Sequence, residues 1–152
     1  MSLDINVWGP ATWVFFHAIT EKIKDNEFNN QKNNLLSIIK KMCSILPCPD
    51  CAQDATNTLN RLNYNTINTK TDLKMYVFQF HNHINKKLNK PQENINILDK
   101  YKKSNLTNIL FSLKIIYTQN INIPKLMIHS LNRKSIINEI LVYFNNNMDK
   151  YD

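Results

Sequence analysis

The sequence has little glycine and no long hydrophobic run, and both absences narrow the range of folds. Its 152 residues contain one glycine. Glycine-rich phosphate loops, Rossmann fingerprints and folds with many β-hairpins all need repeated positive φ angles, so these are excluded. No apolar run approaches the roughly 20 residues of a membrane span, and the first residues lack the basic and apolar regions of a signal peptide. We therefore expect no membrane span and no cleaved leader.

Charge and cysteine content exclude two further classes of protein. The net charge is +7, but only two of the cations are arginines, and the lysines are scattered along the chain. Nucleic-acid-binding domains usually gather their charge on one face and favour arginine, so we expect no nucleic-acid partner. Three cysteines are too few for the disulfide framework of a small secreted protein.

Apolar residues recur with helical spacing along most of the chain, and no alternating strand pattern is present. Four helices are expected up to about residue 90: one opening at Gly9-Pro10, one over about 30–43, one from Pro49 to about residue 62, and one capped by Thr71 and ending before Pro91. The predicted fold is all-α, a four-helix bundle. We assign residues 1–100 to this domain.

Residues 101–152 are expected to form a helical C-terminal extension. Apolar residues at helical spacing mark two stretches in it, over 106–117 and 136–144, and Pro124 separates them. These apolar stripes predict surfaces that pack on something. The sequence leaves open whether they complete the bundle, join two copies of the chain or bind a partner.

The motif Cys48-Pro-Asp-Cys51 carries the clearest chemistry. Pro49 suits the first turn of a helix, which places Cys48 near the N-cap and Cys51 in the first turn. Unpaired N–H groups at that helix end favour a thiolate and therefore disulfide exchange, whereas Asp50 opposes a second negative charge. Taken alone, the motif is compatible with a redox pair, half of a zinc site or a structural pair.

Two helices carry polar and aromatic residues on otherwise apolar faces. Trp13 and His17 lie one turn apart near the N-terminus, where they offer an aromatic and hydrogen-bonding surface. His81 and Asn85 also lie one turn apart, beside Asn82. Each set is explained either by packing in a core or by binding of a flat polar ligand.

The zinc interpretation would have to recruit His81 and His83. Twenty-nine residues separate the CxxC motif from His81. Because His81 and His83 are two positions apart on a helix, their imidazoles point about 200° apart. One tetrahedral ion does not readily bind both. We therefore keep a zinc-binding adaptor, or a flavin-free helical interaction module, as the alternative function.

Three motifs taken together resemble a known family. WGPxTWxxxH at 8–17, LPCPDC at 46–51 and FHNHINKKLNKP at 80–91 resemble, in this order, the Erv/ALR family of FAD-linked sulfhydryl oxidases, and within it the branch of large DNA viruses such as African swine fever virus. The resemblance covers about 85 residues. It implies an enzyme that forms disulfides in dithiol proteins and reduces O₂ to H₂O₂.

The resemblance implies a role for each residue of the motifs. Cys51 would be the thiolate next to the flavin, and Cys48 the outer thiol that exchanges with a thioredoxin-like or virion dithiol protein. The residues implied in FAD binding are Gly9, Thr12, Trp13, His17, Cys51, His81, Asn82, Ile84, Asn85, Lys87, Lys90 and Tyr101. No metal ligand is implied.

Other features of the family carry over in part. Its cellular members have a further disulfide, at places where this chain has Phe78 and about Ile95, so that bond is not expected here. Cys43 is expected to be a buried apolar thiol. The family pairs through its first two helices, which predicts a homodimer with Phe15 and Phe16 at its surface. The expected location is the cytoplasm of a host cell, or a virion assembled there.

Overall fold

The described part of the chain contains helices and no strand, which confirms the predicted all-α class. The computed structural model describes residues 4–119 and 124–152, and side chains for 4–119 and 129–152. The α-helices are α1 (Ile5–Lys22), α2 (Phe28–Ser44), α3 (Pro49–Asn60), α4 (Lys70–Lys87), α5 (Leu106–Tyr117) and α6 (Pro124–Asn147). A 3₁₀ segment, η3 (Ile95–Lys103), joins the region of α4 to α5. The expectation of no cleaved leader concerns the N-terminus, and residues 1–3 there lie outside the described residues.

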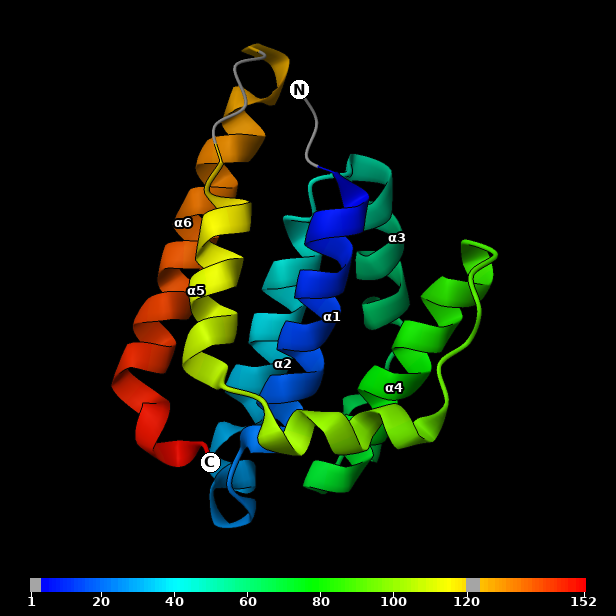
Figure 1. Ribbon diagram of the computed structural model, residues 1–152, viewed down its shortest axis with the longest axis vertical. Coiled ribbons are helices and arrows are strands. Elements are labelled where there is room, and N and C mark those ends of the chain that lie inside the picture. Colours follow the sequence, from blue (N-terminus) through cyan, green and yellow to red (C-terminus); the bar gives the residue numbers. More distant parts are fainter. Residues whose placement is uncertain (1–3, 120–123) are drawn as a thin grey trace.

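Helix α1 lies at the centre of the molecule. Figure 1 shows α3 and α4 on one side of α1, and α5 and α6 side by side on the other. Helix α1 contacts α4, α5 and η3, while α2 packs against α3 and α6. Large apolar side chains of α1 and α2, among them Phe15, Ile19, Leu35 and Met42, are fully buried between these layers. A central helix covered on both sides gives the site a rigid support.

Two helix starts differ from the prediction, and side-chain caps explain both. Helix α1 begins at Ile5 instead of Gly9, because the Asp4 carboxylate accepts a hydrogen bond from the Asn6 N–H at 2.9 Å. Helix α4 is capped by Thr69 instead of Thr71. The Thr69 hydroxyl and the Asp72 carboxylate form a reciprocal capping box there.

The C-terminal extension packs on α1 along its length. Phe144 of α6 meets Phe15 edge to face, with 5.9 Å between ring centroids. Tyr117 of α5 is fully buried and hydrogen-bonds to Thr12 of α1. The last residues are fastened to the end of α1, where Lys24 N–H donates to Lys150 C=O at 3.0 Å. The extension therefore completes the bundle, one of the three possibilities that the sequence left open.

This packing corrects the expectation for Phe15 and Phe16. Both were predicted to form a homodimer surface, but their side chains are 0% and 1% exposed within a single chain. Helix α5 packs along α1, Phe144 of α6 covers Phe15, and Phe16 packs against Trp13. The predicted domain boundary at residue 100 falls inside η3, which itself packs on α1. Within the described ranges, no helix combines the length and the apolar character needed to cross a membrane.

Candidate active site

Cys48 and Cys51 form a disulfide, and α3 starts at Pro49 as predicted. Pro49 is the first helical residue and Cys48 is the N-cap, with its Sγ accepting a hydrogen bond from the Cys51 N–H at 3.2 Å. The two Cα atoms are 5.2 Å apart, and both residues are half-buried. When this bond is reduced, the N–H groups of the first turn and the helix dipole stabilise a thiolate here.

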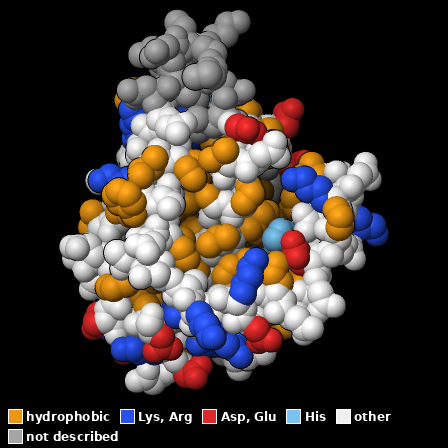
Figure 2. Space-filling model, in the orientation of Figure 1, with side chains coloured by type: hydrophobic (Ala, Val, Ile, Leu, Met, Phe, Trp, Pro, Cys, Tyr) orange, Lys and Arg blue, Asp and Glu red, His pale blue; other side chains and the backbone are white. Residues whose placement is uncertain are grey.

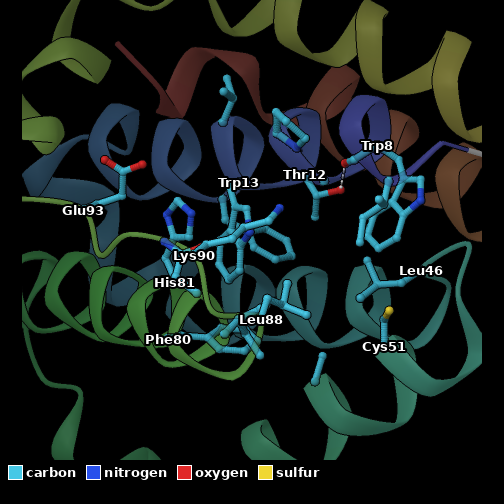
Figure 3. Close-up of a pocket in the computed structure, with 18 of the residues that line it drawn as sticks. Trp8, Thr12, Trp13, Leu46, Cys51, Phe80, His81, Leu88, Lys90 and Glu93 are labelled. Carbon is cyan, nitrogen blue, oxygen red and sulfur yellow. Dashed lines mark hydrogen bonds between the residues drawn. The ribbon is translucent and has the colours of Figure 1, made fainter.

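A cavity of about 340 Å³ lies between α1, α3, α4 and η3. On the face shown in Figure 2, hydrophobic side chains gather in a hollow, with charged side chains around its rim. In Figure 3, Cys51, Leu46 and Trp8 lie at one end, and His81, Lys90 and Glu93 at the other. Ten of the residues predicted from sequence line this cavity: Gly9, Thr12, Trp13, Cys51, His81, Ile84, Asn85, Lys87, Lys90 and Tyr101.

An aromatic cluster forms the wall between α1 and α4. Trp13 stacks on His81, with centroids 4.2 Å apart and ring planes 12° from parallel, and Phe80 meets Trp13 edge to face. His81 Nδ1 lies 3.0 Å from His17 Nε2, and His17 stacks in turn on Tyr101. His17 is 2% exposed and lies behind the cavity wall, so the structure makes it a support for His81 and Tyr101.

Burial controls the protonation of both histidines. Desolvation lowers the pKa of His17 to about 3, with His81 and Lys100 adding to the effect. Desolvation also lowers the pKa of His81 to about 4, helped by Lys100 and Lys90. At neutral pH both imidazoles are therefore uncharged, so one can donate to the other. The Nδ1 atom of His17 is buried and has no hydrogen-bond partner among the described residues.

The end of α4 brings Lys90 back towards Asn85. Asn89 adopts a left-handed conformation with φ of 55°, and Lys90 N–H donates to Asn85 C=O at 2.8 Å, which is the Schellman pattern of helix termination. The Asn85 side chain is 6% exposed and lies on the cavity wall. No side-chain hydrogen bond between its amide and another described residue is present. An amide held in this way is available to a ligand.

Asn82 differs from its neighbours because it does not line the cavity. Its side chain donates to Glu93 C=O at 3.1 Å and accepts from Glu93 N–H at 2.7 Å. Both polar ends of the amide are thus used, and Asn82 holds the segment after α4 against the helix. These bonds position Glu93, which does line the cavity, while the contact of Asn82 with a cofactor stays a prediction.

The remaining sequence interpretations have clear places in the structure. Cys43 is 1% exposed and burial raises its pKa to about 12, as expected of a buried thiol. His81 is buried while His83 is exposed, so the two imidazoles point apart as predicted. Sequence reasoning missed Phe80 and Lys100 on the cavity wall. For Phe80, the available signal was its position directly before His81 in the quoted motif. For Lys100, the only signal was its position next to Tyr101.

Comparison with known proteins places this geometry in context. A family model described as the Erv1 / Alr family matches residues 10–105. The chain is 30% identical over 93 residues to the putative FAD-linked sulfhydryl oxidase 096R of Invertebrate iridescent virus 3. It is 32% identical over 83 residues to an FAD-linked sulfhydryl oxidase of African swine fever virus, and 27% over 98 residues to the mitochondrial FAD-linked sulfhydryl oxidase erv1 of Schizosaccharomyces pombe.

The matched regions cover only part of each protein. They span 60%, 55% and 64% of this chain, and 63%, 69% and 54% of the iridescent virus, African swine fever virus and fission yeast proteins respectively. No solved structure gives a significant match. The matched family region ends at residue 105, so α5 and α6 lie beyond it.

Proposed function

The chain belongs to the Erv1/Alr family, and we propose on that premise that it is an FAD-linked sulfhydryl oxidase. The observation that carries the proposal is the placement of the two cysteines. Cys51 lines the cavity between α1, α3, α4 and η3, which we call the first cavity, whereas Cys48 does not line it. One sulfur of the pair therefore faces the cavity, and the other is left for an external thiol.

The residues of the first cavity fit FAD by their chemistry. Aromatic rings from α1, α4 and η3 offer flat apolar surfaces to a flavin or an adenine. The Asn85 side chain is 6% exposed and lies on the cavity wall, where its amide can hydrogen-bond to a ligand. Lys87, Lys90 and Lys100 are cations on the wall that suit a pyrophosphate. We infer that these groups, with Gly9, Trp13 and His81, hold the cofactor.

The reaction begins with a substrate thiolate that attacks Cys48 Sγ. The new bond is a mixed disulfide, the Cys48–Cys51 bond breaks, and its electron pair goes to Cys51 Sγ. The start of α3 stabilises the anion that forms there. A second substrate thiol then displaces Cys48. The substrate has lost two electrons and two protons, and the cysteine pair is reduced. When bound, FAD supplies the acceptor that reoxidises the pair and the centre at which O₂ is reduced to H₂O₂.

The chain's own residues orient and protect this chemistry. Trp8, Leu46 and Cys51 lie together at one end of the cavity (Figure 3). Apolar side chains around Cys51 exclude water from the inner sulfur, which strengthens local electrostatic interactions. We propose a dithiol protein as the substrate and the cytoplasm of an infected cell, or a virion, as the place of reaction.

The proposal is tested by the spectrum and turnover of the purified full-length chain. We expect flavin absorbance near about 450 nm, as for any oxidised flavin, and oxygen consumption with dithiothreitol. Cys51→Ser and Cys48→Ser should both abolish turnover. Cys48→Ser should keep the long-wavelength absorbance of a thiolate beside a flavin, and Cys51→Ser should lose it.

Cys43→Ser is the control for the third cysteine, because Cys43 also lines the cavity wall but its thiol is 1% exposed and its raised pKa keeps it protonated. It should retain both the flavin and most of the turnover. A colourless protein, or turnover that survives loss of Cys51, would contradict the proposal. The reverse spectral pattern would exchange the roles of the two cysteines.

A further inference from the structure

A second cavity of about 470 Å³ lies on the other side of the CxxC turn. Pro47 and Pro49, the neighbours of Cys48 on each side, line it, together with His129 and Arg133 from α6. Cys51 lines the first cavity, so the turn separates the two spaces. The second cavity therefore lies beside the two residues that flank Cys48, the cysteine that an external thiol would attack.

Arg133 gives this cavity an unusual charge. Its side chain is 4% exposed, and its Nε and Nη2 atoms are buried without a hydrogen-bond partner among the described residues. No ion pair of Arg133 is present within the described ranges, and none of the described lining residues is acidic. Burial lowers the pKa of the guanidinium, yet arginine stays protonated in proteins. A buried, charged group with two free donors is costly unless a ligand pairs with it.

The surroundings of Arg133 favour an anionic ligand. Gln53 and Pro49 belong to the first turns of α3, whose N-terminus carries the positive end of the helix dipole. His129, at the exposed edge, adds a further nitrogen ligand. A planar guanidinium pairs best with a carboxylate, which it can bind through two parallel hydrogen bonds. The cavity is thus suited to the side chain of a glutamate or aspartate.

We propose that this cavity binds an acidic residue of the substrate polypeptide, near the cysteine that attacks Cys48. The inference rests on the proposed oxidase function for its biological meaning, while the binding site itself rests on Arg133 and the cavity. It makes α6, which lies beyond the matched family region, the element that selects the substrate.

The test compares two short synthetic dithiol peptides, one with glutamates beside its cysteines and one with glutamines. The full-length chain should oxidise the glutamate peptide with a KM about tenfold lower, the effect of one charge-assisted hydrogen-bonded pair. Arg133→Met should remove that preference, leave kcat and dithiothreitol oxidation unchanged, and fold normally because it removes a buried unpaired charge. Arg133→Lys should restore part of the preference.

Arg61→Met is the matched control, because Arg61 is the chain's second arginine and lies exposed at the opposite end of α3. It should keep the full preference. Equal KM values for the two peptides in the unaltered chain, or equal effects of the two Met variants, would overturn the proposal.

A binding experiment separates this inference from the proposed function. The same peptides with serine in place of cysteine cannot be oxidised, and calorimetry measures their binding directly. Tighter binding of the glutamate form, dependent on Arg133, supports the site even if no oxidase activity is found. Loss of that difference in an active oxidase removes the site and leaves the function. Self-association of the chain that competes with the peptide would assign the cavity to a second copy, and this too would overturn the proposal.

Discussion

Gly9 shows how one residue can serve the cavity at the expense of the helix. It lies within α1 and on the wall of the first cavity, and glycine is the least favourable ordinary residue of a helix interior after proline. A Cβ added there would meet, among the described atoms, only Ile5 Cγ1 at 3.8 Å, which is ordinary contact. Packing among the described atoms therefore does not require glycine at this position, and we predict that the proposed cofactor does.

We predict opposite effects of Gly9→Ala on stability and on cofactor binding. The free energy of unfolding of the flavin-depleted protein should rise by roughly 0.5–1 kcal/mol, the helix-propensity difference. FAD affinity should fall by about tenfold, because the methyl group occupies space at the ligand surface. Urea unfolding measures the first effect and flavin fluorescence titration the second. A variant that binds FAD as tightly as the unaltered chain would remove Gly9 from the site.

The His17–His81 pair predicts a loss of stability in acid. In the unfolded chain these histidines take up protons near pH 6.5, but in the folded chain only near pH 3 and 4 respectively. The unfolded state therefore binds more protons between about pH 6.5 and 3, and the free energy of unfolding decreases as the pH falls through this window. Between neutral pH and pH 5, each of these two histidines should lower the free energy of unfolding by about 2 kcal/mol.

Urea unfolding at several pH values measures this dependence in the flavin-depleted protein. His81→Phe should reduce the acid-induced loss, since phenylalanine keeps the stack on Trp13 but does not titrate. His83→Phe is the matched control, because His83 is exposed on the opposite face of α4. If both variants show the acid-induced loss of the unaltered chain, His81 is not its source.

At this scale, the sequence predicted which residue types belong to the site but not always how each is used. Gly9, Trp13 and His81 were correctly placed together, because linked motifs and helical spacing constrain them strongly. His17 and Asn82 were predicted as cofactor contacts, yet one lies behind the wall and the other binds Glu93. Helical spacing gives the face of a helix, whereas a hydrogen bond to a distant loop depends on tertiary structure.

At the scale of elements, helix interiors were predictable and helix ends less so. The start of α3 was correct because proline and an N-cap act within three residues. The start of α4 was wrong because two threonines compete as the cap, and Asp72 favours Thr69 over Thr71. The choice depends on the reciprocal hydrogen bond between Thr69 and Asp72, which helical spacing does not reveal.

The contact between α1 and α5 yields a prediction at this scale. The Thr12 hydroxyl donates to Trp8 C=O at 2.6 Å, so the buried Tyr117 hydroxyl donates in turn to Thr12 Oγ1. Tyr117→Phe should lower the free energy of unfolding by about 1 kcal/mol, because one buried hydrogen bond is lost while the ring still packs. Tyr64→Phe, at a position 37% exposed, should change it by less than about 0.5 kcal/mol. Urea unfolding of both variants checks the difference, and equal losses would show that the hydrogen bond does not stabilise the fold.

At the scale of the whole molecule, the C-terminal extension buries a face of α1. The sequence correctly predicted two apolar helical stretches after residue 105, but it could not say what they pack on. That choice depends on the three-dimensional match between Phe144 and Phe15, residues 129 positions apart in the chain. Contacts at such separation leave no periodic trace in a single sequence.

The covered face of α1 predicts how the chain behaves in solution. With Phe15 buried against Phe144 of α6 and Phe16 buried beside Trp13, the full-length chain should not pair with a second copy through these two residues. Phe144→Asp should break the α6 contact, lower the free energy of unfolding by about 3 kcal/mol and expose apolar surface, so that the protein self-associates. Val142→Asp is the matched control: it lies on the same helix but is 51% exposed, and it should change stability by less than about 0.5 kcal/mol. Sedimentation at several concentrations, with urea unfolding, measures both effects. A stable dimer of the unaltered chain whose interface includes Phe15 would show that α6 leaves α1 in solution, because one side chain cannot be covered by both.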